Sequence, residues 1–376
     1  MQERRWNQAS SGLKSAVSLR SGETFRSGET FRSGETFGLN LRFMLIVCVF
    51  VANAIEPLIG TMPALKGLFV WIFTFHMPLF VFVTGYFARS NLNGRAGWAV
   101  MKQIGIQYVI FQSLYSLLDV TLFHVPGMKH SFFIPYLLLW FLIGHLIWRA
   151  ILMLFTRLQV RHPVILSAII GIAAGFLPID GAWLGLSRTL VYLPFFAFGY
   201  LFRDGAFQRF AASRFRPLAA GLSAGLLIAL LLWPNALHPE WLMNHMTFRE
   251  LGWLEQSPWY AIGMRLFIYA LEIVASVAFL AWVPLHVGWI TGLGRRTLYV
   301  FLLHGLIIRL LVVSGLYHYI TTGTQAVLLI AASLACTVLL AQPAVRSLCR
   351  PIIEPQWNGI GGWHRMSAFH RGMKQG

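Results

Sequence analysis

Residues 40–59, NLRFMLIVCVFVANAIEPLI, form an apolar run whose only charged residues, Arg42 and Glu56, lie near its ends. A run of about 20 apolar residues is long enough to cross the hydrocarbon core of a bilayer as an α-helix. Lipid offers no hydrogen-bond partners, so a segment of this length must satisfy its own backbone and is predicted to be helical. The stretch therefore predicts a membrane-spanning helix early in the chain.

Nine further apolar runs follow, separated by short segments that contain Gly, Pro, Arg or Asn. They cover residues 64–88, 97–123, 131–155, 162–178, 187–203, 215–233, 262–285, 298–319 and 324–344. Most have the length that a span needs, and strand signals are absent. The predicted fold class is all-α: a polytopic integral membrane bundle of about ten transmembrane helices.

Composition and charge agree with this prediction. The 376 residues are 57% hydrophobic and only 11% charged, whereas about a quarter of the residues of a soluble domain are charged. The net charge of +17 does not indicate nucleic-acid binding, because no stretch is polar enough to form a basic folded domain. Instead, 24 of the 30 Lys and Arg residues fall in segments that an N-in, C-in topology assigns to the cytoplasm.

The two ends of the chain differ from the apolar part. Residues 1–39 contain RSGETF three times and are predicted to be a disordered cytoplasmic tail, residues 40–345 the membrane domain, and residues 346–376 a basic cytoplasmic tail. The N-terminal segment lacks the apolar core of a signal peptide, which favours a bacterial inner membrane over an organelle. No spacing such as HExxH or CxxC is present, so no metal is expected.

One predicted outer loop, residues 234–260, is long and contains Trp241, Trp253 and Trp259. Tryptophans near the membrane surface commonly anchor a helix at the interface. A long loop also commonly contributes to a binding site. The sequence alone leaves both an interfacial anchor and a lid open.

Polar residues at mid-membrane depth are candidate functional groups, because lipid penalises them. Asn53 in the first run and His76 in the second are predicted to lie at nearly equal depth on adjacent antiparallel helices. Glu272 and Arg309 fall in the same slab, and we interpret them as a charge-compensating pair. His304 lies somewhat nearer the cytoplasm. Contact between neighbouring helices is the alternative role for His76.

Several stretches resemble the integral membrane acyltransferase-3 family, and within it the fucose 4-O-acetylase-like branch. They are NLRFMLIVCVFVANAIEPLI (40–59), TFHMPLFVFVTGYFARS (74–90), WFLIGHLIWR (140–149), LPFFAFGYLFR (193–203) and RTLYVFLLHGLI (296–307). The block with HMPLF and TGYF is the most specific of them. The resemblance implies a ten-span enzyme that moves an acetyl or other acyl group from cytoplasmic acyl-CoA to a hydroxyl of a surface carbohydrate or lipid-linked glycan.

The first-span motif of that family is a basic residue, ten residues and then His. Arg42 fills the basic position, where the resemblance implies binding of the CoA phosphates, but Asn53 stands in place of His. An imidazole with a pKa of about 6.5 accepts a proton from an attacking hydroxyl, whereas an amide does not. Three interpretations remain: His76 supplies the base, Asn53 orients a substrate in a different mechanism, or the protein is a catalytically inactive acyltransferase-like protein.

We therefore expect an O-acyltransferase, most simply an O-acetyltransferase, with acyl-CoA as donor substrate, a carbohydrate acceptor and membrane lipids around it. Its predicted site has His76 and Asn53 as catalytic residues, Arg42 for the donor, and Glu272, Arg309 and His304 in support. A polytopic transporter or flippase is the alternative from another class, since it also explains many spans and charges at the midplane.

Overall fold

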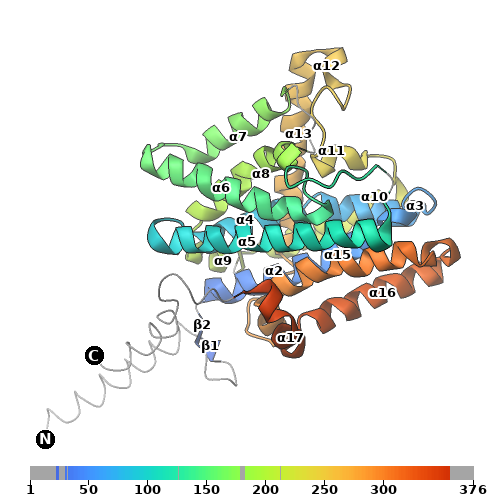
Figure 1. Cartoon of the computed structure of the whole chain (residues 1–376). Helices are drawn as coiled ribbons and strands as arrows, with labels where there is room; N and C mark the ends of the chain where they lie inside the picture. The colour runs from blue at the N-terminus through green and yellow to red at the C-terminus, as the bar shows by residue number, and fades with distance from the viewer. Residues whose placement is uncertain are drawn as a thin grey trace, which may run out of the picture.

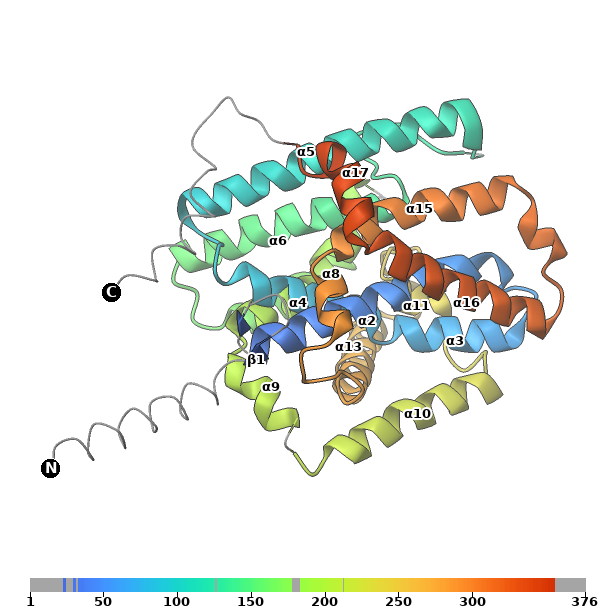
Figure 2. The same ribbon diagram turned by 90° about the horizontal axis from the view of Figure 1, so that it is seen from below.

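The computed structural model describes residues 23–24, 30–31, 33–125, 127–177, 183–211 and 213–355. Within these residues the chain folds into a bundle of helices (Figures 1 and 2). The helices are α2 (Ser33–Ile55), α3 (Pro63–Phe73), α4 (His76–Ala88), α5 (Gly94–Leu118), α6 (Trp140–Arg157), α7 (Pro163–Ala174), α8 (Leu186–Leu201), α9 (Asp204–Ala211), α10 (Arg216–Leu232), α11 (Pro239–Met243), α12 (Trp253–Gln256), α13 (Pro258–Leu280), α14 (Trp289–Gly294), α15 (Thr297–Val313), α16 (Gly323–Leu340) and α17 (Pro343–Ile353). Short 3₁₀-helices are η1 (Glu56–Leu58), η3 (Leu137–Leu139), η4 (Trp183–Gly185) and η5 (Leu316–Tyr319), and η2 (Asp119–Phe123) is a short π-helix.

Seven helical segments are long and apolar enough to cross a membrane. They are Gly34–Leu58, Pro63–Ala88, Gly94–Phe123, Leu137–Arg157, Trp183–Leu201, Pro258–Leu280 and Gly323–Leu340. The prediction of a helical, multi-pass membrane protein is thereby confirmed. The other three predicted spans are apolar helices of 12 to 17 residues, α7, α10 and α15. At 1.5 Å per residue each is shorter than the roughly 30 Å hydrocarbon core.

Both predicted domain boundaries fall inside helices. Helix α2 begins at Ser33, and Thr36 and Phe37 are buried, so the membrane domain starts earlier than residue 40. Two-residue strands, β1 (Glu23–Thr24) and β2 (Thr30–Phe31), pair antiparallel within the RSGETF repeats. The remainder of the predicted N-terminal tail lies outside the described residues.

At the other end, helix α17 crosses the predicted start of the basic tail at residue 346. Its residue Ile353 is fully buried, and the Ile353 carbonyl accepts a 2.8 Å hydrogen bond from Gln107 Nε2 of α5. The segment to residue 353 therefore belongs to the folded part, and residues 356–376 lie outside the described residues.

Helix α2 lies in the middle of the bundle, among α4, α14, α15 and α16 (Figure 2). Buried α2 side chains occur along its whole length, and Leu41, Leu45, Ile46, Ala54 and Ile55 have no exposed surface. A helix that is apolar all round is typical of such a central position. The stretch that predicts the first span thus also builds the core.

Helices α4 and α8 approach each other at two glycines. A Cβ atom on Gly85 would collide with the backbone carbonyl of Phe196, and one on Gly199 with the carbonyl of Phe82. Small residues at such crossings are typical of membrane bundles, because they let two backbones come close. This contact holds α4, the helix that begins with His76, in place.

We expect Gly199→Ala to lower the free energy of unfolding by about 1–3 kcal/mol, because the added methyl meets backbone atoms that cannot rotate away. Gly221→Ala on α10 is the matched control, since nothing lies within 4 Å of its Cβ position. There the helix propensity of alanine favours the substitution. Thermal unfolding of the detergent-solubilised protein checks both, and equal melting temperatures would contradict the close approach.

The second predicted span is interrupted at Thr74 and Phe75, between α3 and α4. Pro78 has no backbone N–H to donate to the Thr74 carbonyl, so the helical ladder fails at this point. Thr74 Oγ1 instead donates to the Trp71 carbonyl at 2.7 Å. The interruption leaves His76 as the first residue of α4.

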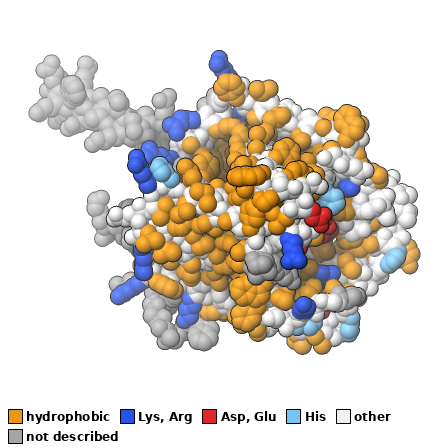
Figure 3. All heavy atoms as spheres, turned by 90° about the horizontal axis from the view of Figure 1, so that it is seen from above, with side chains coloured by type: hydrophobic (Ala, Val, Ile, Leu, Met, Phe, Trp, Pro, Cys, Tyr) orange, Lys and Arg blue, Asp and Glu red, His pale blue; other side chains and the backbone are white. Residues whose placement is uncertain are grey.

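Much of the molecular surface is apolar. Figure 3 shows hydrophobic side chains spread across one face of the bundle. Exposed large apolar residues include Ile165 and Ile169 of α7 and Phe267 and Ile273 of α13. A soluble monomer rarely exposes so much contiguous apolar surface, and lipid tails are the environment that such a surface fits.

Candidate functional site

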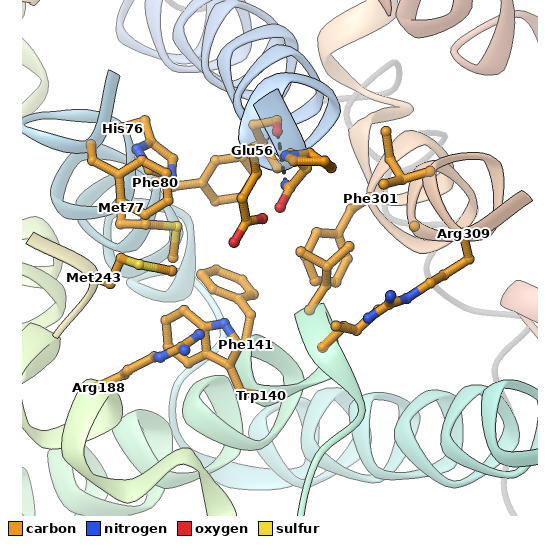
Figure 4. A pocket seen from close by; sticks show the side chains of 18 of the residues that line it. Glu56, His76, Met77, Phe80, Trp140, Phe141, Arg188, Met243, Phe301 and Arg309 are labelled. Atoms are coloured by element: carbon orange, nitrogen blue, oxygen red, sulfur yellow. Dashed lines mark hydrogen bonds between the residues drawn. The ribbon is translucent and has the colours of Figure 1, made fainter. Parts of the chain in front are cut away.

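A cavity of about 450 Å³ lies between α2, α4, α6 and α15 (Figure 4). It is lined by Val49, Asn53, Glu56, Pro57, Phe73, His76, Met77, Phe80, Leu137, Leu138, Trp140, Phe141, Arg188, Met243, Phe301, Gly305, Ile308, Arg309 and Val312. Cavities that hold small molecules are of this size and of this mixed character, apolar with a few polar groups. Three of the predicted site residues, Asn53, His76 and Arg309, are among them.

His76 and Asn53, which are predicted to lie at nearly equal depth, both line the cavity. The His76 ring is 3% exposed, and its Nδ1 lies 2.8 Å from the Ile72 carbonyl. A carbonyl only accepts, so Nδ1 is the protonated nitrogen and Nε2 of the neutral ring is an acceptor. The break at Thr74 and Phe75 gives the imidazole access to this carbonyl, which fixes its tautomer.

Asn53 is oriented by its own helix. Its Nδ2 donates to the Val49 carbonyl at 2.8 Å, so the amide oxygen remains as an acceptor beside the cavity. An amide held in this way aligns a hydroxyl group but does not take its proton. The geometry therefore suits the orienting role among the interpretations of Asn53.

Two charged residues of the cavity, Glu56 and Arg188, were not predicted as site residues. Glu56 follows Asn53 by three residues and lies on the same helical face, which is the sequence signal for its place in the cavity. Figure 4 shows its carboxylate directed into the cavity, and it interacts electrostatically with Arg188 and Arg309.

Arg309 is supported by an aromatic ring. Its guanidinium carbon lies 5.9 Å from the centre of the Tyr136 ring, a cation–π distance. Tyr136 is held in turn, because its hydroxyl donates to Asp119 at 2.9 Å. Asp119 also contacts His130 Nε2 at 3.2 Å. Arg309 thus faces the cavity from an anchored position on α15.

Aromatic side chains form much of the wall. They are Phe73, Phe80, Trp140, Phe141 and Phe301. Phe80 and Phe141 meet edge to face, with ring centres 5.4 Å apart. Flat apolar faces beside a few polar groups suit a ligand that is part ring and part hydroxyl.

Arg42 and His304 do not line this cavity. Arg42 precedes Asn53 by eleven residues of α2, which corresponds to about 16 Å along the helix. Its guanidinium lies 5.3 Å from the centre of the Phe87 ring, at the far end of α4 from His76. His304 is fully buried, with Nδ1 near the Val300 and Phe301 carbonyls, and its Nε2 has no hydrogen-bond partner among the described residues.

The expected pairing of Glu272 with Arg309 is wrong. Glu272 lies outside the cavity, fully buried on α13, and its Oε1 accepts a 3.0 Å hydrogen bond from Asn244 Nδ2. The Asn244 side-chain oxygen accepts from Arg265 Nη1, so the amide joins Glu272 to Arg265, two turns earlier on α13. Equal depth in the membrane does not make two side chains neighbours, because depth does not specify which face of its helix each side chain occupies.

The long loop after α10 contributes to the cavity through Met243 at the end of α11. Asn244 anchors this part of the loop to α13, and the Tyr192 hydroxyl donates to the Leu242 carbonyl at 3.1 Å. Trp253 is buried against Phe248, whereas Trp259 is 81% exposed. The loop therefore contributes Met243 to the cavity wall and exposes Trp259 at the surface, and the anchor and lid roles both stay predictions.

Within the described residues, no group of three or more His, Cys, Asp or Glu side chains is arranged to hold a metal ion. Comparison of the chain with protein-family models found no match. The searches of curated proteins and of solved structures also found none. The candidate site therefore rests on its geometry and on the resemblance noted from the sequence.

Proposed function

We propose that the protein is an integral membrane O-acyltransferase that moves an acyl group, most simply acetyl, from acyl-CoA to a hydroxyl of a carbohydrate. The observation that carries this proposal is that His76 and Asn53 line one cavity. The sequence predicts both as site residues from their depth in the membrane. A histidine with a fixed tautomer, an orienting amide and aromatic walls suit deprotonation of a sugar hydroxyl.

In this mechanism His76 is the general base. The acceptor hydroxyl gives its proton to Nε2 while its oxygen attacks the thioester carbonyl. The C–S bond then breaks, the ester forms, and the leaving CoA sulfur takes the proton from His76. The Asn53 oxygen accepts a hydrogen bond from the acceptor and keeps the reacting hydroxyl in line. Because Nδ1 is tied to the Ile72 carbonyl, the ring does not turn during the transfer.

The donor half of the proposal concerns Arg42. A guanidinium at the cytoplasmic end of α2 suits the phosphates of CoA, and the pantetheine arm extends along the helix toward Asn53. We expect Arg42→Ala to raise the KM for acetyl-CoA about tenfold or more, with a smaller change in kcat, because the contact is made equally in ground and transition states. Steady-state kinetics with labelled acetyl-CoA measures it.

The control is Arg249→Ala, at an exposed arginine of the long loop between α10 and α13. An Arg42→Ala enzyme with an unchanged KM for acetyl-CoA would reduce this residue to an anchor for the inner membrane surface.

The proposed function as a whole is tested with the full-length protein in membranes. Labelled acetyl-CoA and extracted surface glycan are supplied, and label in the glycan is measured against membranes without the protein. A transporter or flippase does not need acetyl-CoA. If no label enters the glycan and glycan still crosses the membrane without acetyl-CoA, the transporter interpretation replaces the proposal. No incorporation and no movement would favour the inactive acyltransferase-like interpretation.

A further inference from the structure

The charges in the cavity do not balance. Arg188 and Arg309 both line it, and among the described residues that line it Glu56 is the one acidic residue. Within the described part of the chain, neither arginine has a carboxylate within 4 Å. Among the described lining residues, one carboxylate that interacts with two guanidinium groups leaves a formal charge of +1. An unmatched charge at this depth is costly, and such charges commonly belong to substrate sites.

Each of the two guanidinium groups also lies at cation–π distance from an aromatic ring. The Arg188 guanidinium carbon lies 5.3 Å from the centre of the Trp140 ring, and that of Arg309 lies 5.9 Å from the centre of the Tyr136 ring. A cation–π contact helps to position a guanidinium group and does not consume all of its N–H donors, so donors remain for another partner. Figure 4 shows the two side chains reaching in from opposite sides toward Trp140 and Phe141.

We propose that the cavity binds an acceptor that carries an anionic group, a sugar carboxylate or a sugar phosphate, between Arg188 and Arg309. The planar fork of arginine matches both oxyanions, and charge-assisted hydrogen bonds from two arginines hold the acceptor from two sides. Trp140, Phe141 and Phe301 lie beside this position as faces for the ring. This inference rests on the proposed function only in naming the ligand as the acceptor.

Binding tests the inference without any transfer reaction. The purified full chain in lipid nanodiscs is titrated with methyl glucuronide, methyl glucoside and glucose 6-phosphate, in the absence of acyl-CoA. We expect at least one anionic probe to bind about 10- to 100-fold more tightly than the neutral glucoside, the effect of hydrogen bonds to a charged group. A preference for the glucuronide assigns a carboxylate, and a preference for the phosphate assigns a phosphate.

Variants then locate the effect. Arg188→Gln and Arg309→Gln are each expected to remove most of the anionic preference, while Arg188→Lys keeps part of it and Arg249→Gln, at an exposed loop residue, keeps all of it. Equal binding of the three probes by the wild-type protein, or no binding of either anion at millimolar concentration, would overturn the inference. So would an unchanged preference in both glutamine variants.

The two proposals fail in different ways. Transfer of label to neutral and acidic acceptors with equal efficiency leaves the acyltransferase in place and removes the anionic subsite. Selective binding of an anion by a protein that never consumes acetyl-CoA leaves the subsite and removes the acyltransferase.

Discussion

Replacing His76 by alanine is expected to reduce kcat for acyl transfer by about 10²- to 10⁴-fold, the usual contribution of a general base. The KM for acetyl-CoA should change little, because the proposed donor contact is about three helical turns away at Arg42. Initial rates with labelled acetyl-CoA and a purified acceptor measure both constants. An equal loss of kcat and kcat/KM would indicate an interaction made only in the transition state.

Two variants accompany His76→Ala. His318→Ala, at an exposed histidine of η5, is the matched control and should retain full activity. Asn53→His restores a histidine at the position that the resemblance implies for the base, and it should be tolerated or raise the rate. If His76→Ala keeps full activity, the base has not moved to the second span. If His76→Ala is inactive and the double variant His76→Ala/Asn53→His is inactive too, a histidine at position 53 does not replace the one at position 76.

The elements of the bundle were accessible from the sequence to different degrees. Each of the ten apolar runs contains a helix, and the second contains two, because hydrophobic length is the main signal for a helix in lipid. Whether a 12-residue helix such as α7 crosses the bilayer depends on neighbouring helices and local membrane thickness. The break at Thr74 had a sequence signal in Pro78, four residues later, because proline removes that hydrogen bond.

Only the depth of the candidate site residues along the membrane normal was predictable from the sequence. Counting residues along antiparallel helices brought Asn53 and His76 to one level, and they share a cavity. The same count assigned Glu272 to Arg309, although these side chains belong to different clusters. Depth fixes one coordinate, whereas the face of the helix and the order of helices around the bundle come from packing. Glu56 was recoverable from its spacing to Asn53, but Arg188 was not, because its place depends on how α8 packs beside α6.

Asn244, Arg265 and Glu272 form a buried cluster that attaches the long loop to α13, and an experiment can test this role. Arg265 and Glu272 are both fully buried on α13, and the Asn244 side chain hydrogen-bonds to each of them. The Arg265 guanidinium also lies over the rings of Phe248 and Trp253 in the long loop. These contacts attach the loop to α13, and Met243, the neighbour of Asn244, contributes to the cavity wall. The two buried charges therefore help to hold the loop residue that precedes the cavity wall.

Arg265→Met is accordingly expected to lower the free energy of unfolding by about 3–5 kcal/mol, because it leaves the Glu272 carboxylate buried without its opposite charge. The double variant Arg265→Met/Glu272→Met removes both charges, and a coupled pair makes it less destabilised than the sum of the two single variants. Unfolding of the solubilised protein measures the cycle, with Arg249→Met at an exposed loop position expected within about 0.5 kcal/mol of wild type. Strictly additive losses would mean that the two charges act independently. In that case the loop would be held by its aromatic contacts, and the affinity of the cavity for its ligands should survive the loss of either charge.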